Sequence, residues 1–149
     1  MIIRKGYTLI EVITVLCIMS ILCALFSNYW RAYNKYSNAV QITYCSSSIM
    51  TFINMCKQYC YYEKKSGYIK FDLLNEELDF YEGTKRKRSW RLPKGFDLYS
   101  TTAGSGNNQL NFDMDGFTPN AGTITFKDRY NSIHNITICV GTAYVQIQE

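Results

Sequence analysis

The chain has 149 residues, a length that allows one domain. If a long helix takes about the first 50 residues, roughly 90 remain for a globular head with a small core. The 16 basic and 12 acidic side chains give a formal net charge of +4, and without Arg4 and Lys5 the charge is +2. An excess of positive charge this small does not by itself indicate a polyanionic partner.

Residues 7–26 form an apolar run near the N-terminus. A run of about 20 residues is long enough to span the hydrocarbon core of a bilayer. Arg4 and Lys5 precede it, and the positive-inside tendency predicts a cytoplasmic N-terminus and an exported remainder. A secretory leader is the alternative, but no A-x-A-like cleavage site follows the run. We expect a single-pass membrane segment.

Glu11 is the one charged residue inside this run. A charged side chain in a membrane helix costs about 2.5–3.5 kcal/mol on insertion scales, so a role for it is expected. Thr8 and Glu11 also have the spacing of a capping box, which stabilises a helix start by about 1 kcal/mol. The two interpretations are compatible, because a cap belongs where a helix begins.

The segment KGYTLIE, residues 5–11, resembles the N-terminal signature of type IV pilins and pseudopilins. The resemblance implies that a prepilin peptidase cleaves between Gly6 and Tyr7 and methylates the new amine of Tyr7. It also implies that Glu11, beside Thr8, neutralises an N-terminal amine when subunits dock into a filament. The family usually has phenylalanine where this chain has Tyr7. The implied partners are other pilin or pseudopilin subunits, the peptidase, an inner-membrane assembly platform and membrane lipid.

Residues 30–66 continue the helix in amphipathic form. No proline or glycine occurs between Tyr7 and Lys64, and aromatic residues at 29–33 are typical of a membrane interface. Apolar residues then recur at steps of three and four, which predicts one buried helical stripe. These residues are Ile42, Cys45, Ile49, Phe52, Ile53, Cys56 and Cys60. We expect the helix to end at Ser66-Gly67, with Lys64 and Lys65 against the negative end of its dipole.

After residue 67 the apolar period changes to two, which predicts strands. The expected strands are 68–71, 88–92, 95–99, 110–114, 123–126, 135–140 and 143–147. Pro93-Lys94 between 88–92 and 95–99 predicts a turn or a hairpin. The predicted fold is α+β: a long N-terminal helix packed on an antiparallel β-sheet head. The predicted divisions are a leader at 1–6, a membrane and filament-core helix at 7–29, an amphipathic helix at 30–66 and the head at 67–149.

The C-terminal region carries a second, looser resemblance. Residues 110–116, 119–126, 135–141 and 144–147 are similar to the β region of the H-type minor pseudopilins of type II secretion and their relatives in type IV pili and Gram-positive competence pseudopili. Some members carry an arginine-bearing turn that is linked to DNA contact. The turn at 141–144 has no arginine here, so that activity is not transferred.

Residues 83–94 contain six basic side chains, a tryptophan and no acidic side chain. The candidate DNA contacts are Lys85, Arg86, Lys87, Arg88, Trp90, Arg91 and Lys94. Such a segment binds phosphates by counterion release, with the tryptophan stacked on a base. An acidic block at 72–82 precedes it. The alternative is therefore a pair of solvated, mutually compensating segments that also match neighbouring subunits, and we favour this alternative.

The six cysteines do not have the placement of a disulfide framework. Cys17 and Cys23 lie in the membrane run, and three others lie on the helical stripe, so we expect small buried apolar residues. A disulfide from Cys139 to the helix is the alternative. No C-x-x-C motif occurs, and His134 is the only histidine, so no zinc site is predicted.

Residues 111–116 imitate the opening of a calcium loop, but position twelve is glycine rather than glutamate. The run Ser46 to Ser48 lacks a G-x-S-x-G elbow, and no catalytic constellation is present. We therefore expect no enzyme activity, metal or cofactor. The sequence predicts a minor pilin or pseudopilin of a competence pseudopilus, a type IV pilus or a type II secretion system, with a DNA-binding minor pilin as the alternative.

Overall fold

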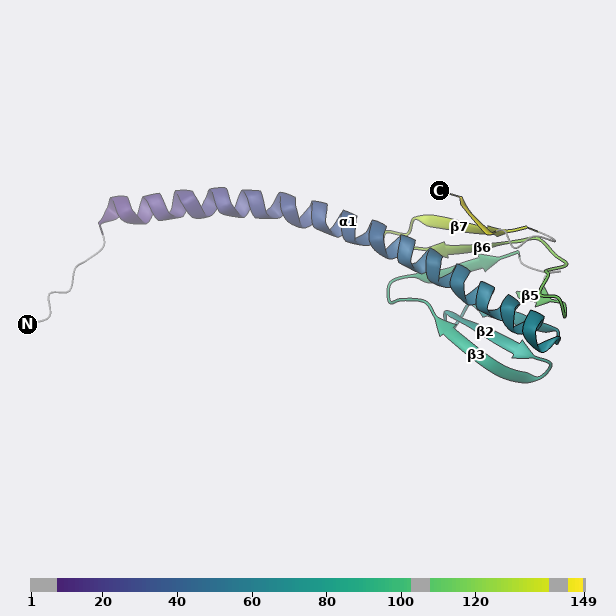
Figure 1. The fold of residues 1–149 in the computed structure, drawn as a ribbon. Coiled ribbons are helices and arrows are strands. Elements are labelled where there is room, and N and C mark those ends of the chain that lie inside the picture. Colours follow the sequence, from purple (N-terminus) through teal and green to yellow (C-terminus); the bar gives the residue numbers. More distant parts are fainter. Residues whose placement is uncertain (1–7, 103–107, 140–144, 149) are drawn as a thin grey trace, which may run out of the picture. The chain divides into compact units, whose positions relative to one another are not determined.

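A computed structural model of the chain describes residues 8–102, 108–139 and 145–148. Within them, one long helix is followed by eight strands (Figure 1). The elements are α1 (Leu9–Glu63), β1 (Gly67–Asp72), β2 (Glu77–Glu82), β3 (Lys85–Arg91), β4 (Asp97–Thr101), β5 (Gln109–Phe112), β6 (Gly122–Lys127), β7 (Ile133–Ile138) and β8 (Val145–Gln148). The predicted α+β fold, with a long helix and an antiparallel head, is confirmed.

The chain divides into two compact units, residues Met1–Ala39 and Val40–Glu149. In the first unit, the described part of α1 is apolar and exposed almost throughout. Among the described residues, α1 is the one helix whose length and composition suit a membrane span, as predicted. The second unit contains the remainder of α1 and all the described strands.

The strands of the second unit form two antiparallel sheets of four strands each. Their orders are β3-β2-β1-β5 and β4-β6-β7-β8. The turn predicted at Pro93-Lys94 is present, closed by the Phe96 N–H donating to the Pro93 carbonyl at 3.1 Å. The alternative of a hairpin is wrong, because β3 pairs with β2 and β4 pairs with β6. Leu92 and Phe96 on either side of the Pro93 turn are buried, whereas Lys94 and Gly95 within it are exposed. The connection from one sheet to the other therefore lies at the surface, and its two ends are anchored in the core. Strand β4 begins at Asp97 because Gly95, with φ 87°, still belongs to the turn.

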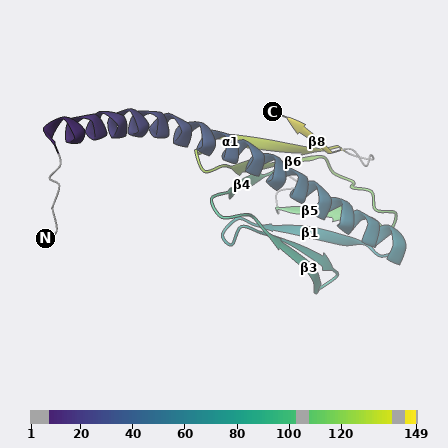
Figure 2. The ribbon, with the colours of Figure 1, turned by 60° about the vertical axis from the view of Figure 1, so that its left-hand side comes forward.

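The core lies between α1 and the two sheets, and Figures 1 and 2 show this part of α1 running along the strands. The predicted helical stripe is buried from Cys45 to Cys60, and Ile42 packs at its margin. Sheet residues facing it are Ile69, Phe71, Leu78, Phe80, Leu98, Leu110, Phe112, Ile124, Phe126, Ile136 and Ile138. Burial of this set on folding is the main stabilising contribution to the head.

Helix α1 ends three residues earlier than predicted. Lys64 adopts the left-handed conformation with φ 53°, and the Lys65 N–H donates to the Cys60 carbonyl oxygen at 3.2 Å. This is the Schellman arrangement, in which glycine usually occupies the left-handed position. A lysine in that position leaves no glycine signal in the sequence, so the helix end was assigned too late.

The cysteines, all within the described residues, have free thiols. Cys45, Cys56 and Cys60 are buried, and burial raises the pKa of both Cys45 and Cys56 to about 12. These thiols therefore act as small apolar groups, as predicted. The alternative disulfide to the helix is not formed, because the Cys139 thiol is exposed and free.

Candidate functional site

The first turn of α1 contains the predicted capping box of Thr8 and Glu11. The Glu11 Oε2 atom accepts the Thr8 N–H at 2.8 Å and the Thr8 hydroxyl at 3.0 Å, while the Glu11 N–H donates to the Thr8 carbonyl at 3.1 Å. Glu11 thus satisfies a backbone donor that the helix itself cannot pair. Gly6 and Tyr7, the predicted cleavage residues, lie outside the described residues.

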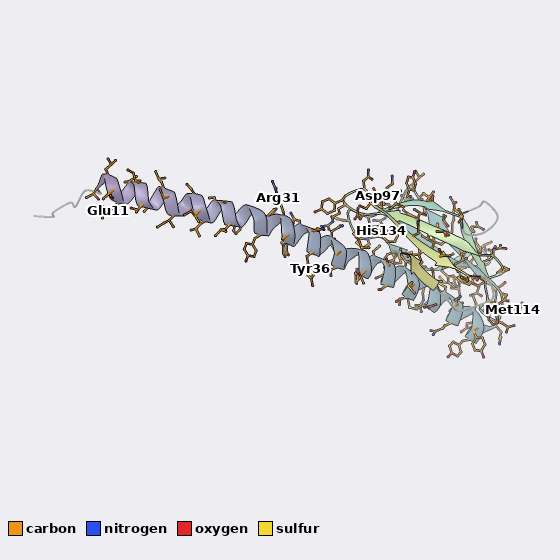
Figure 3. All side chains as sticks on the ribbon, turned by 90° about the horizontal axis from the view of Figure 1, so that it is seen from above. Glu11, Arg31, Tyr36, Asp97, Met114 and His134 are labelled. Carbon is orange, nitrogen blue, oxygen red and sulfur yellow. The ribbon has the colours of Figure 1, made fainter. Side chains whose placement is uncertain are left out.

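The Glu11 carboxylate can accept more hydrogen bonds than the two that form this cap. Both bonds from Thr8 reach the same oxygen, Oε2. An ionised carboxylate accepts about four hydrogen bonds. The side chain is exposed at the start of α1 in Figure 3. Glu11 is therefore able to keep its bonds to Thr8 and to accept an ammonium group on the second oxygen.

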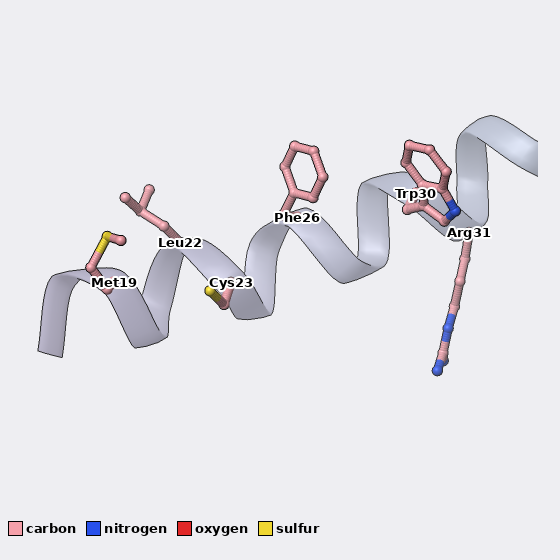
Figure 4. A pocket seen from close by; sticks show the side chains of 6 residues that line it. All are labelled: Met19, Leu22, Cys23, Phe26, Trp30 and Arg31. Carbon is pink, nitrogen blue, oxygen red and sulfur yellow. The ribbon is translucent and has the colours of Figure 1, made fainter. Parts of the chain in front are cut away.

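An apolar groove runs along α1 beyond this turn. It is lined by Met19, Leu22, Cys23, Phe26, Trp30 and Arg31. In Figure 4 the methionine, leucine, phenylalanine and tryptophan side chains project from one side of the helix, and the arginine points away from them. The Phe26 and Trp30 rings stack with centroids 6.5 Å apart. An exposed apolar surface of this extent requires lipid or other protein to cover it.

The basic and acidic segments of the sequence form adjacent strands, β3 and β2. Arg86 lies 3.4 Å from the Asp79 carboxylate, and Arg91 pairs with Glu77. Strand β2 was not predicted, because its three carboxylates interrupt the apolar pattern and its buried residues, Leu78, Asp79 and Phe80, are consecutive instead of alternating. The ion pairs across the hairpin match the favoured interpretation of two compensating segments.

Glu82 joins this hairpin to the end of α1. It accepts a hydrogen bond from the Tyr59 hydroxyl at 2.7 Å and pairs with Lys65 at 2.8 Å and Lys87 at 2.9 Å. The hydrogen bond from Lys65, followed by those from Lys87 and Tyr59, lowers the pKa of Glu82 to about 2. The Lys87 charge is thus committed to a structural cluster.

The remaining candidate DNA contacts have different surroundings. Trp90 packs against the hydrophobic core, and Arg88 donates to the Met55 sulfur at 3.5 Å. Within the described residues, no carboxylate forms an ion pair with Lys85, Arg88 or Lys94. Three of the six cations are therefore paired, and the tryptophan ring lies on the core instead of on an open face.

The calcium-like segment is a hydrogen-bonded turn. The Asp113 Oδ1 atom accepts from the backbone N–H groups of Asp115 at 3.0 Å and Phe117 at 2.7 Å, and Asp115 pairs with Lys64 at 2.9 Å. His134 stacks on Phe126. No group of three or more ligating side chains suited to a metal occurs in the part of the chain that the structure describes.

Sequence reasoning missed a cleft at the end of α1, formed by residues 57–62 of the helix and 115–117 of the turn. More than 50 positions separate the two segments, and neither contains a ligand motif. The turn at 141–144, which lacks the family's arginine, lies outside the described residues.

Comparison with solved structures identifies the fold. The minor pseudopilin EpsH of the Vibrio cholerae type II secretion system matches with a TM-score of 0.54 at 11% identity, over 69% of this chain and 92% of that chain. A second EpsH structure matches with a TM-score of 0.54 at 11% identity, over 68% and 89%. The type IV minor pilin FimU of Pseudomonas aeruginosa PAO1 matches with a TM-score of 0.57 at 10% identity, over 76% and 92%.

No protein-family model and no curated protein matches the sequence. At identities near 10%, the structural matches establish the fold. They agree with the predicted resemblance to the fold of pilins and H-type pseudopilins. The chain has the pilin fold of the minor pilins and pseudopilins.

Proposed function

We propose that the protein is a structural subunit of a type IV pilus-like filament, a minor pilin or pseudopilin of a competence pseudopilus, a type IV pilus or a type II secretion system. The observation that carries the proposal is the pilin fold joined to an exposed apolar helix with Glu11 in its first turn. An apolar segment of this length anchors the precursor in the membrane before assembly.

The proposed mechanism is mechanical. A prepilin peptidase removes residues 1–6 and methylates the amine of Tyr7, and an assembly platform draws residues 7–29 from the bilayer into the filament core. The Glu11 carboxylate then pairs with an N-terminal amine, its own or that of a neighbouring subunit. An ion pair at this depth removes most of the cost of holding an isolated charge in an apolar environment. The two bonds from Thr8 orient the carboxylate for this contact.

DNA contact is not part of the proposal. Half of the basic residues between 83 and 94 are paired with carboxylates of β2, and the Trp90 ring packs on the core. Ion-paired cations release fewer counterions on binding a phosphate backbone, so their contribution to affinity is small.

The test is processing followed by recovery in filaments. Mass spectrometry of protein extracted from the membranes of its host should find a mature chain that begins at methylated Tyr7. A host without the peptidase, and a Gly6→Leu variant, should retain Met1. Surface filaments sheared from cells should contain the mature chain. A mature chain that retains Met1, or one never found with filaments, would contradict the proposal. Deletion strains scored for transformation, piliation and secretion identify the system.

A further inference from the structure

Three connections between strands meet at one end of the head: 73–76 between β1 and β2, 92–96 between β3 and β4, and 128–132 between β6 and β7. The Glu76 carbonyl accepts the Leu92 N–H at 2.9 Å, which joins the first connection to the second. The Arg129 guanidinium donates to the Lys94 carbonyl at 3.4 Å, which joins the second to the third. These connections, together with Ile133 at the start of β7, form one surface, here called the rim.

The rim carries three exposed apolar side chains. Leu74, Tyr130 and Ile133 have exposed fractions of 94%, 60% and 56%. The Asp72 Oδ1 atom accepts the Leu74 N–H at 3.0 Å, and the Asp128 Oδ1 atom accepts the Tyr130 N–H at 2.9 Å. Both turns therefore have a hydrogen-bonded backbone, and a contact through them requires little further ordering. Exposed apolar side chains on one surface indicate a contact with protein or lipid.

The rim lies at the end of the head where α1 enters it. Strand β1 follows the end of α1 and runs back along the helix (Figures 1 and 2). A strand of six residues covers about 20 Å, and the buried part of α1 from Cys45 to Cys60 covers about 22 Å. Figure 3 shows Asp97, which directly follows the second connection, at one end of the head and Met114 at the other. The rim is therefore level with the first turns of α1 after Val40.

Residues 30–39 limit the distance between the rim and a bilayer that holds residues 7–29. They belong to α1, and this length of helix covers about 15 Å. The headgroup layer occupies about 5–8 Å of that distance, because a bilayer of about 40–45 Å surrounds a hydrocarbon core of about 30 Å. Membrane helices tilt by about 20° on average, and a tilt toward the rim reduces the remaining gap. The chain therefore keeps the bilayer surface within reach of the rim.

Several carboxylates at the rim already have partners within the protein. Glu77, at the end of the first connection, pairs with Arg91, and the Asp128 carboxylate accepts backbone N–H groups of its own turn. The Asp72 carboxylate accepts hydrogen bonds from the main chain and the side chain of Asn75. Attraction between opposite charges therefore does not select the partner of the rim. Aliphatic side chains beside a tyrosine suit the interfacial zone of a bilayer, where tyrosine is enriched.

We propose that, before assembly, the rim rests on the exported surface of the bilayer that holds the chain's own anchor, with Leu74, Tyr130 and Ile133 inserted among the lipid headgroups. The inference deepens the proposed function, on which it rests, by naming a lipid contact of the head in the membrane-bound subunit. Three side chains make a weak contact, but the anchor raises the effective concentration of the bilayer surface at the rim. A weak contact is also released easily when the subunit is drawn into a filament.

The test is quenching of tryptophan fluorescence by brominated phosphatidylcholine, with the full chain reconstituted in nanodiscs. Tyr130→Trp places a reporter on the rim, and Tyr62→Trp places a matched, exposed reporter at the far end of the head. Both chains also carry Trp30→Phe, because Trp30 borders the membrane run, and both keep Trp90 in the core. Relative to nanodiscs without bromine, the Tyr130→Trp chain should lose much of its emission and the Tyr62→Trp chain should lose little.

A second pair of substitutions tests the inserted side chains. Leu74→Ser with Ile133→Ser, added to the Tyr130→Trp chain, removes the apolar contacts without adding charge. Quenching should fall to the level of the Tyr62→Trp chain. Met114→Ser, which alters an exposed residue at the far end, is the matched control and should leave the quenching unchanged. Because salt screens exposed charges and does not weaken apolar contacts, the quenching should persist at high ionic strength. Circular dichroism establishes that each variant is folded.

Three results would overturn the contact: equal quenching of the two reporters, quenching that high salt abolishes, or quenching that the paired serine substitutions leave unchanged. A blue shift of the Tyr130→Trp emission without quenching by bromine would show that protein covers the rim, and would overturn the contact as well. Each of these results leaves the proposed function standing if the wild type is processed and recovered in filaments. A wild type that is absent from filaments would instead contradict the proposed function.

Discussion

Substitution of Ile53 tests whether α1 has two different environments. Ile53 of α1 is fully buried in the core between the helix and the sheets, whereas Ile21, of the same residue type in the same helix, is exposed. Ile53→Ala removes buried carbon atoms and leaves a cavity, which costs about 2–5 kcal/mol. The second unit, residues Val40–Glu149, has the size of a small domain, whose free energy of unfolding is roughly 5–15 kcal/mol, so this substitution removes a large part of it.

The assay is thermal unfolding of the full chain in detergent, followed by near-ultraviolet circular dichroism of the aromatic residues in the head. A loss of about 3 kcal/mol should lower the midpoint by more than about 10 °C. Ile21→Ala should leave the midpoint of the head unchanged, because that side chain is exposed and lies outside the hydrophobic core. Equal shifts for the two variants, or no shift for Ile53→Ala, would refute the assignment of the core.

Three further outcomes are expected. Glu82 has a folded pKa of about 2 against an ordinary value of 4.5, so its contribution to stability is present above pH 4.5 and is lost as the pH falls toward 2. Glu82→Gln should therefore unfold more easily at neutral pH and lose less stability over that range, as measured by urea titration at each pH. Gly116→Ala should destabilise the head by at least about 1–2 kcal/mol in urea unfolding, because the residue has positive φ and its Cβ would collide with the Lys57 carbonyl. Duplex DNA should bind with a dissociation constant no lower than the roughly 10⁻⁴–10⁻⁶ M that is typical of non-specific contacts at physiological salt. The double substitution Lys85→Ser with Arg88→Ser should reduce the salt dependence of that binding. Tight, salt-resistant retention of DNA in a filter assay would contradict this expectation.

The helix and most strands were predictable because their apolar spacing is local. The stripe from Cys45 to Cys60 has the period of a helix, and the segments around Ile124 and Ile136 alternate with the period of a strand. These patterns require only that one face be buried. The capping box of Thr8 and Glu11 was likewise predictable, because both partners lie within one turn.

The errors arose where distant residues decide the structure. Pro93 predicts a turn, but the burial of Leu92 and Phe96 sends the chain to the second sheet instead of back along the first. Strand β2 was missed because its carboxylates are paired with cations of the following strand. The cleft between Tyr62 and Phe117 depends on the packing of a turn on α1, which no local pattern encodes.

The most direct test of the central claim separates the two roles of Glu11. Glu11→Gln keeps an oxygen that accepts the Thr8 N–H, so the helix cap remains, but the charge is lost. Glu11→Val loses both the helix cap and the charge. Each variant is expressed in place of the wild type, and the mature chain in sheared filaments is measured relative to that in membranes. If Glu11 pairs with an N-terminal amine, both variants should remain in the membrane and be absent from filaments. Normal incorporation of Glu11→Gln would show that Glu11 acts only as a cap, and normal incorporation of Glu11→Val would contradict any role for Glu11 in assembly.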